Sequence, residues 1–176
     1  RYTKSKQGGE DAEAIAVVKR HSVCFISVFG HKLGLVGLHL KSNPSDPEAN
    51  AQRTAEAAIV QRIVQREIIA RGYAPIILGD INDYDPDVKM ADATRETQTS
   101  VLRMLKNCDP HQEGDELINI ASHIPRVADR FSSHWDYNEN GAVDGDDVFT
   151  LIDHILIDRR LSAGIKRAFI CHASSL

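Results

Sequence analysis

Ala74-Pro-Ile-Ile-Leu-Gly-Asp-Ile-Asn-Asp83 is the stretch that decides the fold of this 176-residue chain. Its apolar run, Ile76–Leu78, is short and is bounded by Pro and Gly, which predicts a strand buried on both faces. Gly79 then removes a side chain where another group must approach the backbone closely. Asp80 and Asn82 are two residues apart, so their side chains point the same way in an extended chain. A carboxylate beside an amide suits a phosphate site, although a strand end followed by an Asx turn has the same composition.

The composition is that of an ordinary globular protein, with 42% hydrophobic and 26% charged residues and a length that suffices for one domain. The formal net charge of -4 excludes a strongly basic nucleic-acid-binding tail. No apolar run approaches the roughly 18 residues of a membrane span. Cys24, Cys108 and Cys171 are too few and too scattered for a disulfide framework or a zinc site. Because the chain opens at Arg1 in mid-pattern, we expect the native start to lie upstream, and a secreted or periplasmic location stays open.

Apolar segments with short connections predict most of the strands. Those at 14–18, 23–29 and 33–40 follow one another closely, which predicts an antiparallel meander. Further strands are expected at 76–78, 131–135, 151–157 and 165–172.

One long helix is predicted from Pro47 to about Arg71. Asp46 has a side chain that caps helix N-termini, and Pro47 fits the first helical position. Apolar residues recur through this segment at helical spacing, and Gly72 is placed to end the helix. We expect this helix to cover an outer face of the sheets and a shorter helix to form at 97–107.

Three polar residues interrupt apolar strands: His39, Asp80 and Asp153. A buried charge costs several kcal/mol unless it is paired or bound. One such residue is usually a satisfied core residue. Three of them, each late in a strand, are more easily explained if the strand ends converge on one site.

The motifs His39-Leu-Lys-Ser42, Gly79-Asp-Ile-Asn-Asp83 and Ile152-Asp-His-Ile155, together with the helix that contains Arg53, occur in a recognisable order. Their order and spacing resemble the endonuclease/exonuclease/phosphatase superfamily, the deoxyribonuclease-I-like fold, over roughly residues 14–176. The resemblance implies an α+β fold of two packed, mostly antiparallel β-sheets flanked by helices, a four-layer sandwich.

The same resemblance implies metal-dependent hydrolysis of phosphate esters by a phosphodiesterase or nuclease, with Mg²⁺ (or Mn²⁺) as cofactor. His39 would contact the scissile phosphate and assist protonation or stabilise charge. Asp80 would orient or deprotonate the attacking water, Asn82 would hold a phosphoryl oxygen, and Asp153 would orient a second catalytic histidine. Phosphoryl transfer needs positioning and charge neutralisation, which these groups supply. The substrate is a phosphodiester such as DNA, RNA, a phospholipid or a small molecule, and no protein partner can be assigned.

The sequence departs from the family pattern at both ends. The family's early Asn and metal-binding Glu would lie upstream of the residues present, and its closing Ser-Asp-His motif is missing where the chain stops at Ser174-Ser-Leu176. His172 is a poor substitute because it falls inside an expected strand. We therefore expect residues 1–176 to form a single partial domain, incomplete at both ends, and the activity of the chain as given stays open.

An acidic loop at 136–147 matches the calcium-loop pattern D-x-[DN]-x-[DN]-G-x5-E with one change. Position 12 is Asp rather than Glu, so a lower affinity for Ca²⁺ is expected. Gly141 provides the sharp turn. The pattern also resembles a dockerin loop, but that module uses two such loops and only one is present. A solvated acidic loop is the alternative. The expected calcium ligands are Asp136, Asn138, Asn140, the Ala142 carbonyl, Asp144 and Asp147.

Three functions therefore stay open: a metal-dependent phosphodiesterase, a calcium-dependent binding module in which the 136–147 loop is the functional part, and an inactive scaffold fragment. The first requires one group of four residues to converge in a single cleft, namely His39, Asp80, Asn82 and Asp153.

Overall fold

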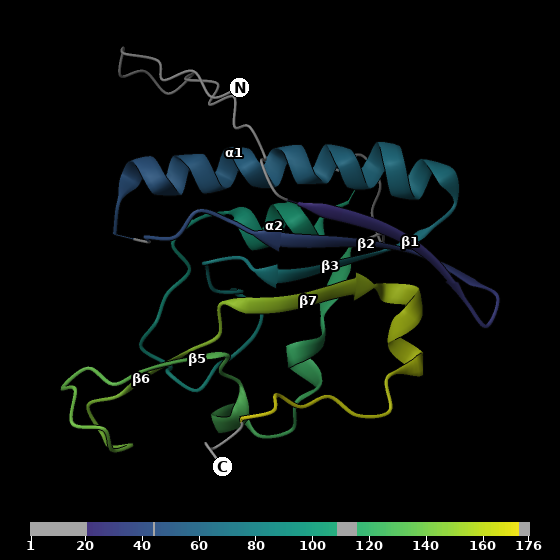
Figure 1. Cartoon of the computed structure of the whole chain (residues 1–176). Coiled ribbons are helices and arrows are strands. Elements are labelled where there is room, and N and C mark those ends of the chain that lie inside the picture. Colours follow the sequence, from purple (N-terminus) through teal and green to yellow (C-terminus); the bar gives the residue numbers. More distant parts are fainter. Residues whose placement is uncertain (1–20, 44, 109–115, 173–176) are drawn as a thin grey trace.

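The computed structural model describes residues 21–43, 45–108 and 116–172 (Figure 1). Its main element is a five-stranded sheet with the strand order β1-β2-β3-β7-β4. The five strands are β1 (Ser22–Val28), β2 (His31–His39), β3 (Ala74–Asp80), β7 (Asp153–Asp158) and β4 (Leu117–Asn119). A second sheet pairs β5 (Ser133–Trp135) with β6 (Val148–Thr150).

The long helix predicted for residues 47–71 is confirmed. It begins as α1 (Pro47–Ile63). The helix then widens in a π-helical segment (Val64–Ile68), tightens in a 3-10 turn (Ile69–Arg71) and ends at Gly72, whose φ is 76°. The Asp46 side chain caps the N-terminus by accepting a backbone N–H of the first turn at 2.9 Å. Within the described part of the chain, every helix is too short or too polar to cross a membrane.

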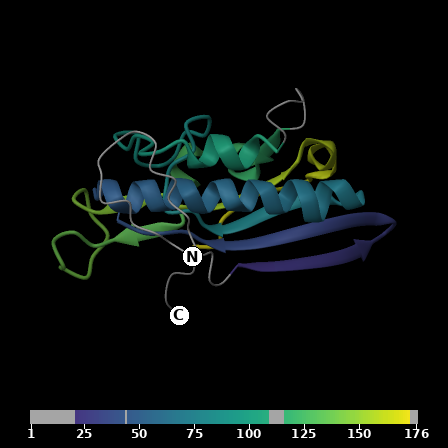
Figure 2. The same ribbon diagram turned by 90° about the horizontal axis from the view of Figure 1, so that it is seen from above.

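The main core lies between the helices and one face of the five-stranded sheet. Helix α1 and the shorter α2 (Val101–Lys106) run along this face together (Figure 2). Alternate residues of β2 and β3 point toward the helices, as the period of two along a strand requires. The core residues include Val36, Leu38, Leu40, Val60, Val64, Ile68, Ile77, Leu102, Leu105 and Leu156. The expected α+β class, with two mostly antiparallel sheets and flanking helices, is confirmed.

Strand pairing is antiparallel except between β2 and β3. Helix α1 makes the connection between these two parallel strands, as such connections require. Gly79 confirms the expectation of a close approach: a Cβ on this residue would lie 2.0 Å from the Leu38 carbonyl oxygen, and its φ is +132°. Only glycine allows β2 and β3 to stay paired up to their last residues.

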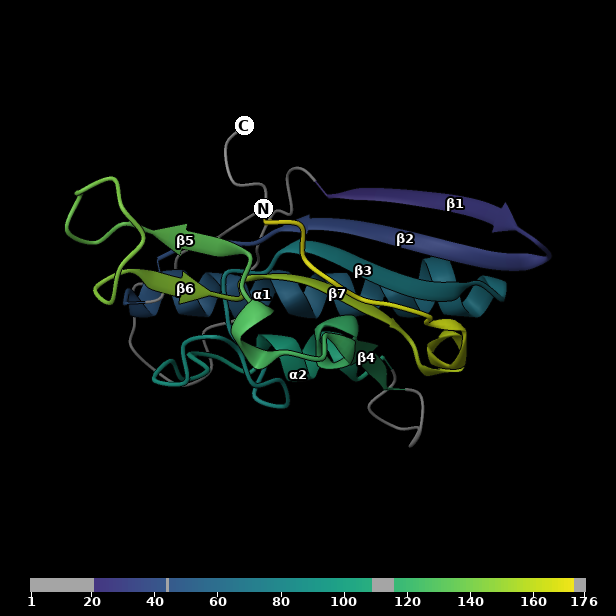
Figure 3. The same cartoon turned by 90° about the horizontal axis from the view of Figure 1, so that it is seen from below.

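Two expected strands have other outcomes. The segment 14–18 lies outside the described residues. The expectation of a strand at 165–172 is wrong: this segment crosses under β7 without joining a sheet (Figure 3). Its alternating pattern instead reflects packing of Ala168 and Ile170 against a small second core that contains Ile124 and Leu151. The three-residue strands β4 and β6 were not expected, because such short strands have no detectable periodicity.

Candidate active site

His39, Asp80 and Asp153 form one row across three adjacent strands. In the strand register His39 pairs with Asp80, and Asp80 pairs with Asp153. Directly paired residues project from the same face of a sheet, so the three side chains lie on one face. The His39 Nε2 atom is 3.7 Å from Asp80 Oδ2. The structure thus brings together three of the four residues that the sequence singled out, and the fourth, Asn82, is two residues from Asp80.

Asp80 has one engaged and one available carboxylate oxygen. Its Oδ1 atom accepts the backbone N–H of Asn82 at 2.9 Å, while Oδ2 faces His39. Burial raises the pKa of Asp80 above its ordinary value, and the negative charge of Asp153 raises it further. A carboxylate with a raised pKa accepts a proton more readily than an exposed one, which suits a general base.

Asn82 is held in the left-handed region, with φ of 55°. Asparagine tolerates this conformation better than most residues. Its Nδ2 atom donates to the Leu40 carbonyl oxygen at 3.0 Å, which ties the residues after β3 to the end of β2. The Asn82 side chain also hydrogen-bonds the Asp80 carboxylate, which acts to lower the pKa of Asp80 against the effect of burial.

The row is more exposed to solvent than the sequence led us to expect. His39 and Asp153 are exposed and Asp80 is half-buried, because they project from the face that α1 and α2 do not cover. Contrary to the expectation from the sequence, His39 and Asp153 are therefore not buried, and Asp80 is buried only in part. Beside Asp153 an apolar cavity of about 220 Å³ opens on the same side, lined in part by Leu78, Ile155 and Phe169.

Buried charged residues of α1 hold the backbone that follows His39. Arg53 is 0% exposed, and its guanidinium donates to the Lys41 carbonyl oxygen at 2.6 Å and to Asn50 Oδ1. Glu56 accepts the Lys41 backbone N–H at 3.0 Å. Both polar groups of the Lys41 peptide are therefore paired with one helix, which fixes the path of the chain away from His39.

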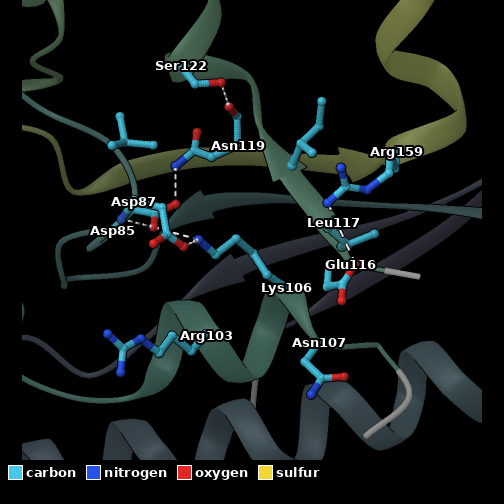
Figure 4. A pocket seen from close by; sticks show the side chains of 12 residues that line it. Asp85, Asp87, Arg103, Lys106, Asn107, Glu116, Leu117, Asn119, Ser122 and Arg159 are labelled. Atoms are coloured by element: carbon cyan, nitrogen blue, oxygen red, sulfur yellow. Dashed lines mark hydrogen bonds and ion pairs between the residues drawn. The ribbon is translucent and has the colours of Figure 1, made fainter. Parts of the chain in front are cut away.

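A buried network that the sequence analysis missed lies on the opposite face of β7. Asn119 joins Asp85 and His154: its Nδ2 is 3.0 Å from Asp85 Oδ2 and 2.9 Å from His154 Nδ1. Asp85 also accepts from Lys106 Nζ at 2.7 Å (Figure 4). His154 Nε2 lies 2.9 Å from the Asp83 carbonyl oxygen, so the imidazole is neutral and donates through this nitrogen. The network therefore ties β7 to the loop after Asp80.

Burial sets the ionisation of this network. Burial lowers the pKa of His154, which is 2% exposed. For Asp85, burial acts to raise the pKa, but hydrogen bonds from Lys106 and Asn119 outweigh it and the pKa falls. The signal in the sequence was the alternation of Asp153 and His154, which places one on each face of the strand. Asp85, Lys106 and Asn119 also line a pocket of about 430 Å³ between α2 and β4.

The row offers part of a metal site. Among the described residues, no three His, Cys, Asp or Glu side chains are grouped closely enough to hold an ion. Two carboxylates, Asp80 and Asp153, nevertheless face the same side from adjacent strands. This donor set fits Mg²⁺ or Mn²⁺, since Mg²⁺ is usually bound through one or two carboxylates together with water and substrate phosphate.

His172 contacts Phe131. Its ring stacks on Phe131 with centroids 3.7 Å apart, and its Nε2 is 2.9 Å from the Phe131 carbonyl oxygen. The expected strand around His172 is absent, so its position in a strand is no longer an argument against a catalytic role. Asp153 is instead held through its backbone, whose N–H donates to Ser132 Oγ at 2.9 Å.

Comparison with known proteins finds similarity in structure alone. No family model matches the sequence, and no curated protein matches it. Among solved structures, the 3′ phosphatase NExo from Neisseria, bound to a product DNA hairpin, is 18% identical, with a TM-score of 0.53 over 84% of this chain and 55% of that one. Truncated TDP2 of Caenorhabditis elegans is 20% identical, with a TM-score of 0.47 over 78% of this chain and 46% of that one. TDP2 of D. rerio, complexed with single-strand DNA product, is 17% identical, with a TM-score of 0.48 over 77% of this chain and 45% of that one.

The chain spans about half the length of these proteins. At such low identity the similarity concerns the fold, and it agrees with the resemblance carried by the sequence motifs. The chain has the deoxyribonuclease-I-like fold, which it shares with NExo.

Proposed function

We propose that this protein hydrolyses phosphate esters with the help of a divalent cation, and that His39, Asp80, Asn82 and Asp153 form its active site. The observation that carries the proposal is the strand register, which aligns His39, Asp80 and Asp153 in one row on an exposed face. A calcium-dependent binding module or an inactive scaffold would have no need of this row. The fold shared with a 3′ phosphatase supports the same reaction class.

Asp80 is the general base in this proposal. Its Oδ1 atom is occupied by the Asn82 N–H, so Oδ2 is the oxygen that orients a water molecule and takes its proton. Burial and the neighbouring charge of Asp153 raise the pKa of Asp80, which increases its affinity for that proton. The resulting hydroxide attacks phosphorus, and the bond from phosphorus to the leaving oxygen breaks.

His39 and Asn82 act on the phosphoryl group. His39 is 76% exposed in its side chain and lies beside Asp80, so its ring can donate to a phosphoryl oxygen. The Asn82 amide, which hydrogen-bonds the Leu40 carbonyl and the Asp80 carboxylate, would turn an N–H from Asp80 to a second phosphoryl oxygen. Neutral and cationic donors placed before the reaction stabilise the charge that spreads over the phosphoryl oxygens.

Asp153 has two roles in the proposal. It would hold Mg²⁺ or Mn²⁺ together with water and substrate phosphate, and the cation would supply neutralisation of negative charge on the phosphoryl group. The family resemblance also assigns it the orientation of a second histidine. Its backbone is fixed by Ser132, so the carboxylate position is set before any substrate arrives.

Nucleic acid is the substrate class that we favour. The structural neighbour NExo was solved with a product DNA hairpin, and its fold is the one shared by this chain. A net charge of -4 means that the cation and His39, rather than a basic surface, must offset the phosphate charge.

The test is a comparison of three substrates in Mg²⁺ or Mn²⁺: a DNA duplex, a DNA oligonucleotide with a 3′-phosphate, and p-nitrophenyl phosphate. The proposal predicts metal-dependent cleavage or phosphate release that chelation abolishes. It also predicts that Asp153→Asn loses most of the rate and that Glu67→Gln, an exposed carboxylate on the helical segment after α1, does not. A folded protein that processes none of the three substrates with either metal would overturn the proposal.

A further inference from the structure

The acidic loop at 136–147 connects β5 to β6 as the tip of a hairpin (Figure 1). Trp135 pairs with Val148, so the ends of the loop are held at the distance between adjacent strands. Gly141, the sixth residue, has φ of 75°, the left-handed turn that the calcium-loop pattern places there. The loop therefore forms a closed turn on a fixed base.

One carboxylate in this loop is buried without full pairing. The Asp147 side chain is 0% exposed, and its Oδ2 atom accepts from His134 Nε2 at 2.6 Å and from the Asp144 backbone N–H at 3.3 Å. Its Oδ1 atom is also buried, and among the described residues it has no hydrogen-bond partner. A buried carboxylate oxygen without a donor is costly, and a cation removes that cost. This observation is independent of the sequence pattern.

The other oxygen-bearing side chains of the loop turn toward one another. Asn138 and Asn140 both donate through Nδ2 to Asp144 Oδ2, at 3.1 and 2.6 Å. Asp136 accepts the backbone N–H groups of Asn140 and Gly141 at 3.2 and 2.7 Å.

We propose that this loop binds one Ca²⁺ ion. The carboxylates alone do not form a sufficient group in the described structure, so the amide oxygens and a carbonyl must complete the site. Rotation of the Asn138 and Asn140 amides by half a turn would bring their oxygens to the same centre and release the backbone N–H groups of Asn140 and Ala142 that these oxygens now accept. The ligands are Asp136, Asn138, Asn140, the Ala142 carbonyl, Asp144 and Asp147.

The ligand chemistry selects the ion. All the ligands are hard oxygens from one flexible loop, and Ca²⁺ accepts six to eight such ligands in irregular geometry. Mg²⁺ demands an octahedron at shorter distances and retains water, so a protein-only loop holds it weakly. Transition metals favour imidazole or thiolate ligands. The imidazole of His134 is already engaged with Asp147.

The ion has a structural role in this proposal. Ser132, next to β5, donates its N–H to the Thr150 carbonyl oxygen at 2.8 Å. The Ser132 Oγ atom accepts the backbone N–H groups of Ile152 and Asp153 at 3.1 and 2.9 Å. Closing the loop thus stabilises the hairpin that fixes Asp153, one residue of the proposed catalytic row.

The experiment is calcium titration of the chelator-treated protein by calorimetry and thermal melting, with two matched variants. Asp144→Asn removes a ligand, whereas Asp146→Asn removes an equal charge two residues away. We expect Asp144→Asn to raise the Kd for Ca²⁺ by about tenfold or more and Asp146→Asn to change it by less than about threefold. Calcium should raise the melting temperature of the wild type, and Mg²⁺ at the same concentration should raise it less.

A third variant separates this site from the catalytic row. Asp80→Asn should keep the full response to calcium, because the loop does not use Asp80. Loss of calcium binding in Asp80→Asn would overturn the inference and assign the ion to the row. Absence of heat and of a melting shift at millimolar calcium, or equal effects of the Asp144 and Asp146 variants, would also overturn it. Each outcome is independent of hydrolysis.

Discussion

Asp80 and Asp153 face each other directly across the antiparallel pair β3–β7, with both side chains on the open face of the sheet. Burial raises the pKa of Asp80 most, and the charge of Asp153 adds to it. Asp153→Asn removes that charge, so the pKa of Asp80 should fall. The carboxyl carbon shift of Asp80, followed by NMR against pH, measures the change without any assay. An unchanged or higher pKa would show that the two carboxylates do not interact.

Gly79 and Gly72 both have positive φ, but only Gly79 is crowded. A Cβ on Gly79 would lie 2.0 Å from the Leu38 carbonyl oxygen, whereas nothing lies within 4 Å of one on Gly72. Gly72→Ala should cost only the left-handed backbone, about 1–2 kcal/mol. Gly79→Ala should cost at least about 3 kcal/mol, because β2 and β3 must separate. Urea denaturation of both variants checks this, and equal losses of stability would contradict the close approach.

Arg53 should be among the most sensitive residues of α1. Arg53→Met leaves the Lys41 carbonyl without its buried donor, which should lower the free energy of unfolding by about 2–4 kcal/mol. Arg62→Met, at an exposed position of the same helix, is the control and should stay within about 0.5 kcal/mol of wild type. Equal stability of the two variants would mean that Arg53 does not hold the chain after His39.

The long helix and the central strand could be predicted because each has local signals. Asp46, Pro47 and Gly72 mark the helix ends, and the Pro and Gly around Ile76–Leu78 mark the strand. The strand predicted for 165–172 was wrong because alternation of apolar and polar residues also arises where an irregular segment packs on a small core.

The residues of the proposed catalytic row could be named from the sequence, but their pairing could not be predicted. His39, Asp80 and Asp153 are noticeable as polar residues in apolar strands, yet their register depends on contacts between distant segments. The adjacency of Asp153 and His154 placed His154 on the other face of the strand, but its pairing with Asn119 could not be predicted, because the two residues come from different elements.

His154 should make stability depend on pH. Its pKa is lowered by burial from the ordinary 6.5, so the unfolded chain binds the extra proton first as pH falls. The stability that neutral, buried His154 contributes is therefore fully present above pH 6.5 and is lost as the pH falls from there through the pKa of His154 in the folded protein. His154→Gln should therefore lose less stability than wild type between about pH 8 and about pH 5. Parallel stability curves from urea denaturation would contradict a neutral, buried imidazole.

The central claim is that Asp80 activates water for attack on a phosphate ester, and the Asp80→Asn variant tests it most directly. Its carboxamide keeps the shape and can accept the Asn82 N–H, but it cannot take a proton at neutral pH. The measurement is single-turnover hydrolysis of a 3′-phosphorylated DNA oligonucleotide in Mg²⁺, with oligonucleotide binding measured separately. The account predicts a rate lowered by about a hundredfold or more with binding retained. A rate close to that of wild type in a variant that still binds DNA would contradict it.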